Sequence, residues 1–111
     1  MEPTHFLYLI ENPRKDFAAT MTAAERELFG RHAVYYREHA KTGLVLMAGP
    51  ALDDTYGICV LATTDFAVAD AFRAGDPVVK EGLMKGVLHP WRASIGSLFE
   101  PRTTIATDRN A

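Results

Sequence analysis

The feature that most constrains this chain is the order of its strand-like and helix-like segments. Four short apolar runs, each bounded by turn residues, predict strands; they are residues 5–10, 44–49, 56–63 and 86–95. A long helical pattern separates the first run from the second, and a shorter one separates the third from the fourth. The β-α-β-β-α-β order predicts an α+β fold of the ferredoxin-like type, with a four-stranded antiparallel sheet.

The helix boundaries carry their own signals. The long helix is expected over 22–41, because "TAAE" at its start has the spacing of a capping box and Gly43 suits a left-handed residue after its end. Asp65 is placed to cap the second helix. The pair Asp76-Pro77 predicts a further short helical turn, since proline is tolerated at the first helical position.

The predicted strands are apolar on both faces. In the first strand, Phe6, Tyr8 and Ile10 share one face, while Leu7 and Leu9 share the other. Two helices can cover only one face of a four-stranded sheet, and a sheet with one solvated face would alternate apolar with polar residues. We therefore expect a homodimer in which the uncovered faces of two sheets pack together. The alternative, a cover formed by the chain end, is disfavoured because "PRTTIATDRNA" has few apolar residues.

Length, charge and cysteine content bound the class of protein. The 111 residues suit one domain, assigned to 1–100, followed by a polar tail at 101–111. The net charge of -2, with no basic stripe, gives no reason to expect nucleic acid as a partner. No apolar run is long enough for a membrane span, and the acidic start is unlike a signal peptide. Cys59 is the single cysteine, which suits a reducing compartment, so we expect a cytoplasmic protein.

The long helix contains two histidines whose orientation bears on function. When the helix is turned at about 100° per residue from Leu28, His32 falls at roughly 40° and His39 at roughly 20°, inside the apolar arc. His32 is therefore expected to face the sheet, where both ring nitrogens need partners. A core histidine bonded to a carbonyl or a tyrosine is one explanation. A shared metal ion is disfavoured, because the two rings start about 10 Å apart along the helix axis. We expect no metal, and with no phosphate-binding loop or dinucleotide fingerprint we expect no cofactor.

Several motifs together resemble the YCII-related family of small YciI-like proteins. They are "RH" early in the long helix, "TGLVLMAGP" after it, and "GDPVVKEG" before the apolar run "VLHPW". The resemblance extends over roughly residues 5–95 and implies a ferredoxin-like fold that forms a dimeric α/β barrel. It also implies that His32 and Asp76 form a His–Asp pair in a pocket beside the sheet, proposed as an active site. This chain departs from the family pattern where His89-Pro90 interrupts the last strand.

Tyr35, Trp91 and Arg31 are further candidates, for substrate binding. Tyr35 and its neighbour Tyr36 flank the inward arc of the helix, and a phenol near His32 can orient a substrate; packing in the core is the alternative for these tyrosines and for Trp91. Arg31 can hold an anionic substrate, although at roughly 300° it lies at the edge of the polar face. Asp76 also has a structural alternative, as the cap of its own helical turn.

Two functions from different classes remain open. The first is a small cofactor-independent enzyme in which His32 is the general acid/base and Asp76 orients it, which suits elimination, isomerisation or hydrolysis of a small molecule. Chemistry attributed to the resembled family points to dehydrochlorinase-type lyases. The second is a non-catalytic dimeric module that binds a small ligand. An open pocket of roughly a few hundred Å³ beside the imidazole would favour the enzyme.

Overall fold

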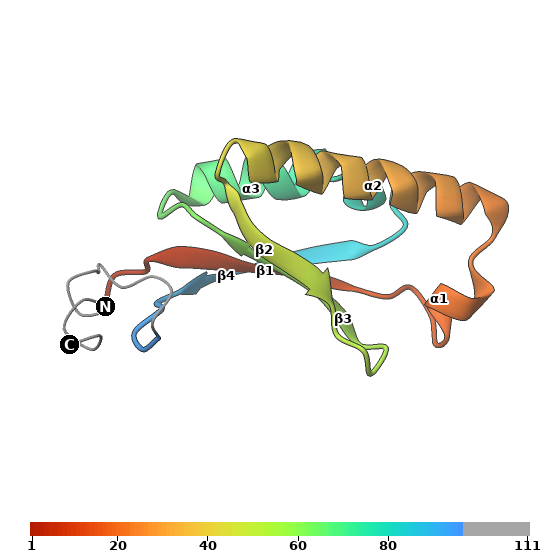
Figure 1. The fold of residues 1–111 in the computed structure, drawn as a ribbon, viewed down its shortest axis with the longest axis horizontal. Coiled ribbons are helices and arrows are strands. Elements are labelled where there is room, and N and C mark those ends of the chain that lie inside the picture. Colours follow the sequence, from red (N-terminus) through yellow and green to blue (C-terminus); the bar gives the residue numbers. More distant parts are fainter. Residues whose placement is uncertain (97–111) are drawn as a thin grey trace, which may run out of the picture.

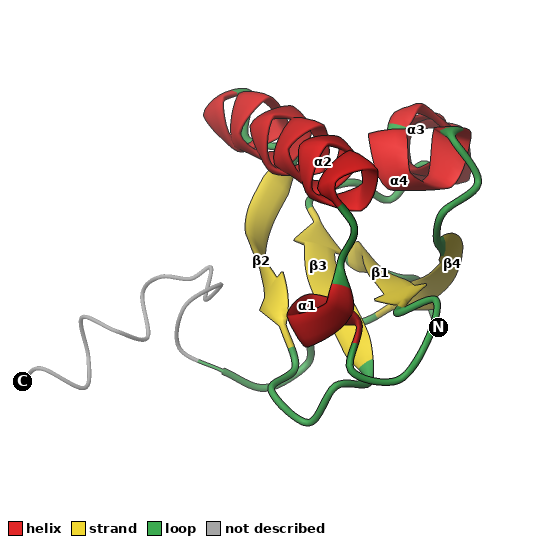
Figure 2. Cartoon of the chain, turned by 90° about the vertical axis from the view of Figure 1, so that its right-hand side faces the viewer, coloured by secondary structure: helices red, strands yellow, loops and turns green. Residues whose placement is uncertain are grey.

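In the part of the chain that the structure describes, a four-stranded antiparallel sheet carries the long helix and the two helices that follow the third strand on one face (Figures 1 and 2). The computed structural model describes residues 1–96. The elements in chain order are β1 (His5–Glu11), α1 (Phe17–Thr20), α2 (Ala23–Lys41), β2 (Val45–Pro50), β3 (Tyr56–Leu61), α3 (Phe66–Gly75), α4 (Pro77–Lys80) and β4 (Lys85–Trp91). The strand order is β2-β3-β1-β4, which confirms the predicted α+β class and antiparallel sheet. The sheet is open rather than closed into a barrel, with β2 and β4 at its edges.

The long helix α2 begins at the predicted capping box. The Thr22 side chain accepts a hydrogen bond of 3.1 Å from the backbone N–H of Glu25, and the Glu25 carboxylate accepts one of 2.9 Å from the backbone N–H of Thr22. The Arg14 guanidinium donates two further bonds, of 2.9 and 2.8 Å, to Glu25. Gly43, at φ 89°, follows the helix in the left-handed region. The capping box therefore defines where α2 begins and Gly43 defines where it ends, and these bounds determine which residues of α2 face the sheet.

The short helix α1 is a feature that the sequence pattern does not predict. Phe17 is buried in it, and its ring meets the ring of Phe29 on α2 edge-on, with centroids 6.2 Å apart. The preceding Asp16 has φ 56°, and its backbone N–H donates a 2.8 Å hydrogen bond to the Asp54 carboxylate in the β2–β3 loop. Four residues are too few to display a periodicity, so packing of Phe17 and the Asp54 contact define this helix rather than propensity.

The last strand is shorter than predicted. We expected a strand over 86–95, whereas β4 ends at Trp91. Pro90 lies within the strand opposite Phe6, which is tolerated because β4 is an edge strand and needs no outward N–H donor at that position. The predicted tail at 101–111 lies outside the described residues.

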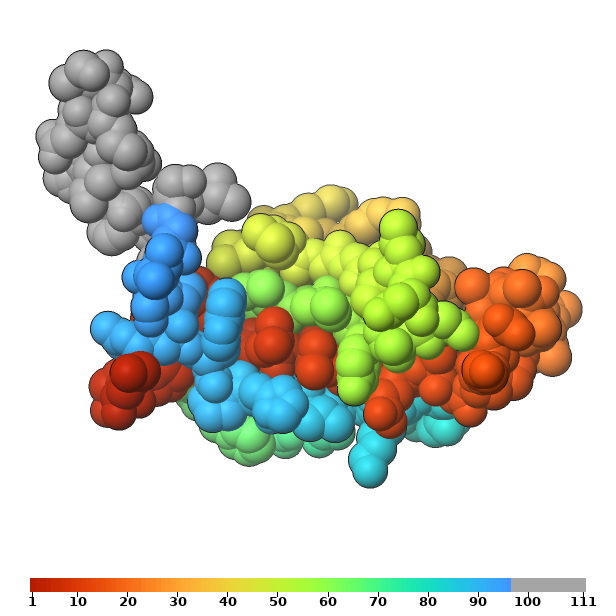
Figure 3. Space-filling model, turned by 90° about the horizontal axis from the view of Figure 1, so that it is seen from below, coloured from red at the N-terminus to blue at the C-terminus, as the bar shows by residue number. Residues whose placement is uncertain are grey.

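The two faces of the sheet differ in what covers them. The core lies under the helices and includes Phe6, Tyr8, Ile10, Cys59, Leu61, Phe72 and Val78. The opposite face has no helix over it among residues 1–96 (Figure 3). On that face Leu9 lies between Ile58 and Val87, and Met47 lies beside Val60. Apolar side chains on both faces are therefore present, as predicted from strand parity.

None of the helices described has the length and hydropathy that a membrane span requires.

Candidate active site

His32 and Asp76 form a buried pair between α2 and the start of α4. The Nδ1 atom of His32 lies 2.7 Å from Oδ1 of Asp76, although the residues are 44 positions apart in the chain. His32 is 8% exposed and Asp76 is 0% exposed. A carboxylate can only accept, so Nδ1 donates this hydrogen bond, and in the neutral form of the ring Nε2 keeps its lone pair. The inward orientation predicted for His32 is therefore confirmed, and Asp76 is its partner.

The Asp76 carboxylate accepts four hydrogen bonds, which use all of its acceptor sites. Its Oδ1 atom accepts from His32 and, at 3.3 Å, from the backbone N–H of Val78 in the first turn of α4. Its Oδ2 atom accepts from the hydroxyl groups of Tyr8, at 2.9 Å, and Tyr36, at 3.1 Å. Asp76 thus caps α4 and also holds His32, so both roles weighed for it occur together.

The two phenols beside Asp76 remain protonated donors. Burial raises the pKa of Tyr8 and of Tyr36 well above the ordinary value, and the neighbouring Asp76 charge raises both further. The Tyr36 ring also lies against the imidazole of His32, with centroids 4.3 Å apart. Because both hydroxyl protons are directed at Oδ2, the carboxylate is held on the side away from His32.

A glycine in β4 makes room for the Tyr8 phenol. A Cβ atom at Gly86 would lie 2.7 Å from Cε1 and 2.8 Å from the hydroxyl oxygen of Tyr8. Real Cβ atoms do not approach other heavy atoms so closely, and the core around Tyr8 leaves little space for the ring to move. Gly86 therefore permits the phenol to reach Asp76.

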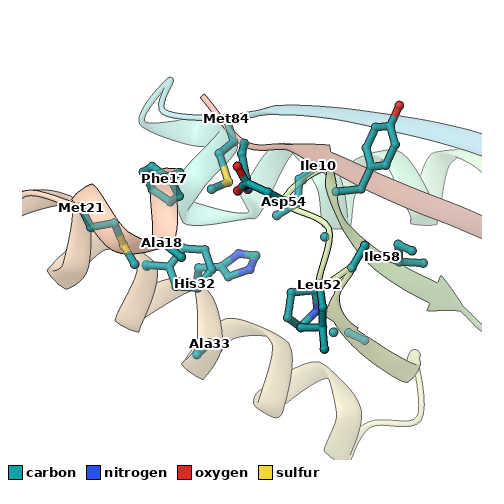
Figure 4. Close-up of a pocket in the computed structure, with 18 of the residues that line it drawn as sticks. Ile10, Phe17, Ala18, Met21, His32, Ala33, Leu52, Asp54, Ile58 and Met84 are labelled. Atoms are coloured by element: carbon teal, nitrogen blue, oxygen red, sulfur yellow. Dashed lines mark hydrogen bonds between the residues drawn. The ribbon is translucent and has the colours of Figure 1, made fainter. Parts of the chain in front are cut away.

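A cavity of about 700 Å³ opens beside the His32 ring (Figure 4). Its walls come from α1, α2, β2, β3 and the loops between them, and they are mostly apolar. Figure 4 shows the imidazole near Met21, Phe17 and Met84, with Leu52 across the cavity. Within residues 1–96, Nε2 of His32 has no hydrogen-bond partner. This nitrogen is therefore available to a molecule in the cavity.

The three residues predicted to bind substrate lie elsewhere. Tyr35 donates a 2.8 Å hydrogen bond to the carbonyl of Phe72 and stacks on its ring, and burial raises its pKa to about 12. Arg31 is exposed on α2. Trp91 is exposed at the end of β4, with its ring 6.0 Å from that of His5. The cavity walls include none of the three.

The structure instead brings three other side chains to the site. Tyr8 and Tyr36 bind Asp76, and Arg37 lines the cavity. Tyr36 follows His32 by four residues and so shares its helix face, but Tyr35 follows by three, and this spacing does not separate the two tyrosines. Tyr8 has the inward parity of β1, and a buried phenol needs an acceptor, although its sequence position does not identify Asp76 as that acceptor.

Other reactive side chains add little chemistry here. In the part of the chain that the structure describes, no three His, Cys, Asp or Glu side chains are grouped to hold a metal ion. Cys59 is buried, and burial together with the Asp76 charge raises its thiol pKa to about 12. It is therefore a protonated core residue rather than a nucleophile at neutral pH.

The fold and site together define a small α+β protein with a buried His–Asp pair beside an apolar cavity. The sequence profile of the YCII-related domain matches residues 6–91 of the chain. The chain therefore belongs to the YCII-related family. Neither the curated proteins nor the solved structures gave a significant match.

Proposed function

We propose that this protein is an enzyme that transfers a proton to or from a small molecule bound in the cavity beside His32. The observation that carries the proposal is that the two imidazole nitrogens have different surroundings. Nδ1 is fixed by the buried carboxylate of Asp76, while the ring borders a cavity large enough for a small organic molecule. A module that used His32 only to stabilise its core would have no need of an open space beside the ring.

The arrangement supports general acid/base catalysis. Nε2 accepts a proton from a substrate atom in the cavity, and the Asp76 carboxylate stabilises the imidazolium that results. In an isomerisation the proton then returns from Nε2 to another atom of the substrate. In an elimination the electron pair of the broken C–H bond forms the double bond as chloride leaves, and Nε2 releases the proton to solvent. In a hydrolysis the proton comes from the attacking water and passes from Nε2 to the leaving group. Elimination, isomerisation and hydrolysis all fit this sequence, with dehydrochlorinase-type elimination the reaction suggested by the family. Such a base typically contributes a rate factor of about 10²–10⁴.

Proton abstraction can be tested without knowledge of the product. Small halogenated and hydroxylated aromatic acids are incubated with the protein in D₂O, and deuterium incorporation at carbon is followed by mass spectrometry. The wild type is expected to accelerate exchange on at least one compound, and His32→Gln to lose about 10²-fold or more of that acceleration. His39→Gln is the matched control, since His39 donates to the Tyr35 carbonyl and lies outside the cavity wall.

The outcomes separate the two functional classes. Acceleration that requires His32 but not His39 supports the enzyme. Compounds that bind beside His32 without exchange or turnover, across the whole panel, would instead support the alternative of a non-catalytic, small-ligand-binding module. Asp76→Asn supplies an independent variant, because asparagine is also a good helix cap and should retain α4.

The proposed working unit is a homodimer. The uncovered face of the sheet presents a set of apolar side chains on neighbouring strands, with Leu9 opposite Ile58 and Val87, and Val60 opposite Leu7. A second copy is the natural cover for such a face, because a two-fold axis brings two identical apolar surfaces together. The family resemblance, with its dimeric α/β barrel, supports the same assembly.

A further inference from the structure

The charged side chains that line the cavity are separated along its length. Asp16 and Asp54 lie at one end, where they are joined by the hydrogen bond from the Asp16 backbone to the Asp54 carboxylate. This end adjoins Phe17, which packs against Phe29 of α2. Arg37 lines the same cavity from further along α2, and it is the lining residue with a guanidinium group. From Phe29 to Arg37 the helix rises about 12 Å.

At the acidic end, the Asp54 carboxylate is already engaged by the chain itself. The two oxygens of Asp54 accept separate hydrogen bonds, one of 2.8 Å from the Asn12 side chain and one of 2.8 Å from the backbone of Asp16. Arg37 differs, because none of the ion pairs formed within residues 1–96 involves its guanidinium group. The guanidinium therefore has free donors at the cavity, whereas each oxygen of Asp54 already accepts one hydrogen bond from the chain.

His32 lies between these ends. It follows Phe29 by about one helical turn and precedes Arg37 by five residues, or about 7.5 Å along the axis and roughly 140° around it. His32 and Arg37 nevertheless line one cavity, so a molecule with an anionic group at Arg37 can place its remaining atoms against the imidazole and the apolar wall. The acidic end would repel the same group, which orients the molecule in one direction.

We infer that the ligand of this site is a small molecule with an apolar body and one carboxylate, and that Arg37 selects it by binding the carboxylate. This inference rests on the proposed function, since it specifies the substrate class of the same cavity. A planar guanidinium can donate two parallel hydrogen bonds to the two oxygens of a carboxylate. A neutral amide of the same shape has one acceptor oxygen and no charge, so it cannot accept this pair of bonds. Arg37 is thus a specificity-determining residue, distinct from the proton-transfer pair.

The test compares three probes that share one ring: benzoate, benzamide and benzylamine. Binding to the full-length protein is titrated at low ionic strength, because salt screens an exposed arginine. The NMR signals of the His32 ring report whether the probe reaches the site. We expect benzoate to bind about tenfold more tightly than benzamide, and benzylamine to bind most weakly.

Substitutions then assign the preference to a residue. Arg37→Gln should reduce the benzoate-to-benzamide ratio to about one while leaving benzamide affinity unchanged. Arg26→Gln is the matched control, because Arg26 is an exposed arginine on the same helix and does not line the cavity. It should retain the tenfold ratio.

Each other outcome overturns a specific part of the account. If benzoate and benzamide bind equally, or if the preference survives in Arg37→Gln, the carboxylate inference is wrong while the ligand site and the proposed function stand. Tighter binding of benzylamine would likewise overturn it, in favour of the acidic end. If none of the three probes perturbs His32, the cavity is not a ligand site, and the proposed function fails together with the inference.

Discussion

The hydroxyl of Tyr8 donates a 2.9 Å hydrogen bond to Asp76, which lies 68 residues away in the chain. This bond joins the central strand β1 to the start of α4, on the side of the carboxylate opposite His32. It makes the pair part of the core, because Asp76 is held from the sheet as well as from α2. The position of the imidazole therefore depends on Tyr8 and Asp76, which do not line the cavity.

Removal of the Asp76 carboxylate is expected to lower the free energy of unfolding far more than its conversion to an amide. In Asp76→Ala, the donors of His32, Tyr8 and Tyr36 lose their common acceptor in a buried site, so the free energy of unfolding should fall by about 3–5 kcal/mol. Asp76→Asn keeps one acceptor oxygen and the helix cap, and the hydroxyl groups of Tyr8 and Tyr36 can rotate to accept from the amide N–H groups. The free energy of unfolding should therefore fall by only about 1–3 kcal/mol. Urea unfolding measures both. Equal losses in the two variants would contradict the four-donor geometry.

Gly86→Ala tests the space around Tyr8. The added methyl group would overlap the phenol, displace its hydroxyl from Asp76 and lower the free energy of unfolding by about 1–3 kcal/mol. Gly30→Ala is the matched control, since a Cβ atom there meets nothing within 4 Å. That change in an exposed helix should stabilise the protein by about 0.5–1 kcal/mol. A neutral effect of Gly86→Ala would show that Tyr8 has room to move.

The capping box gives a stability contribution with a defined pH dependence. Hydrogen bonds from Arg14, and then from the Thr22 backbone, lower the pKa of Glu25 from 4.5 to about 2. A lowered folded-state pKa means that the carboxylate stabilises the fold above 4.5 and that this contribution is lost as the pH falls toward about 2. The difference in unfolding free energy between wild type and Glu25→Gln should therefore be present at neutral pH and should shrink across that range.

A control for the pH prediction is available on the same helix. Glu38 pairs with Lys41 at 3.7 Å, and both side chains are largely exposed. Such a pair contributes little, so Glu38→Gln should leave unfolding nearly unchanged at every pH. A difference for Glu25→Gln that stays constant with pH would mean that the Glu25 charge does not act through Arg14 and the cap.

The oligomeric state tests the role of the uncovered sheet face. We expect the wild type to sediment as a dimer and Val87→Asp to sediment as a monomer, because the substitution places a charge within an apolar interface. Val34→Asp is the control, since Val34 is also exposed but belongs to α2. A wild-type monomer, or a Val87→Asp variant that remains dimeric, would place the interface elsewhere or exclude it.

Local signals were sufficient to predict most of the fold. The capping box fixed the start of α2, and helical periodicity placed His32 on the inward face, where the structure has it. The Asp76-Pro77 pair likewise predicted α4. Each of these depends on interactions within a few residues of the chain, which a sequence displays directly.

Features that depend on distant contacts were not predictable in the same way. The helix α1 forms because Phe17 packs on Phe29 and Asp16 meets Asp54, and no local pattern encodes either contact. The identity of the Asp76 partner for His32 came from family resemblance rather than from spacing. The role of Tyr8 depends on β1 lying beside α4, which only the assembled sheet defines.

The most direct test of the central claim is the tautomer of His32, measured from the ring nitrogens by ¹⁵N NMR at a pH where the ring is neutral. The account predicts a protonated Nδ1, donating to Asp76, and an unprotonated Nε2 available to the cavity. His39 is an internal reference, because its Nδ1 faces the Tyr35 carbonyl at 2.8 Å and must carry a proton. A proton on Nε2 of His32, with Nδ1 unprotonated, would contradict the pairing with Asp76 and remove the general base from the proposed site.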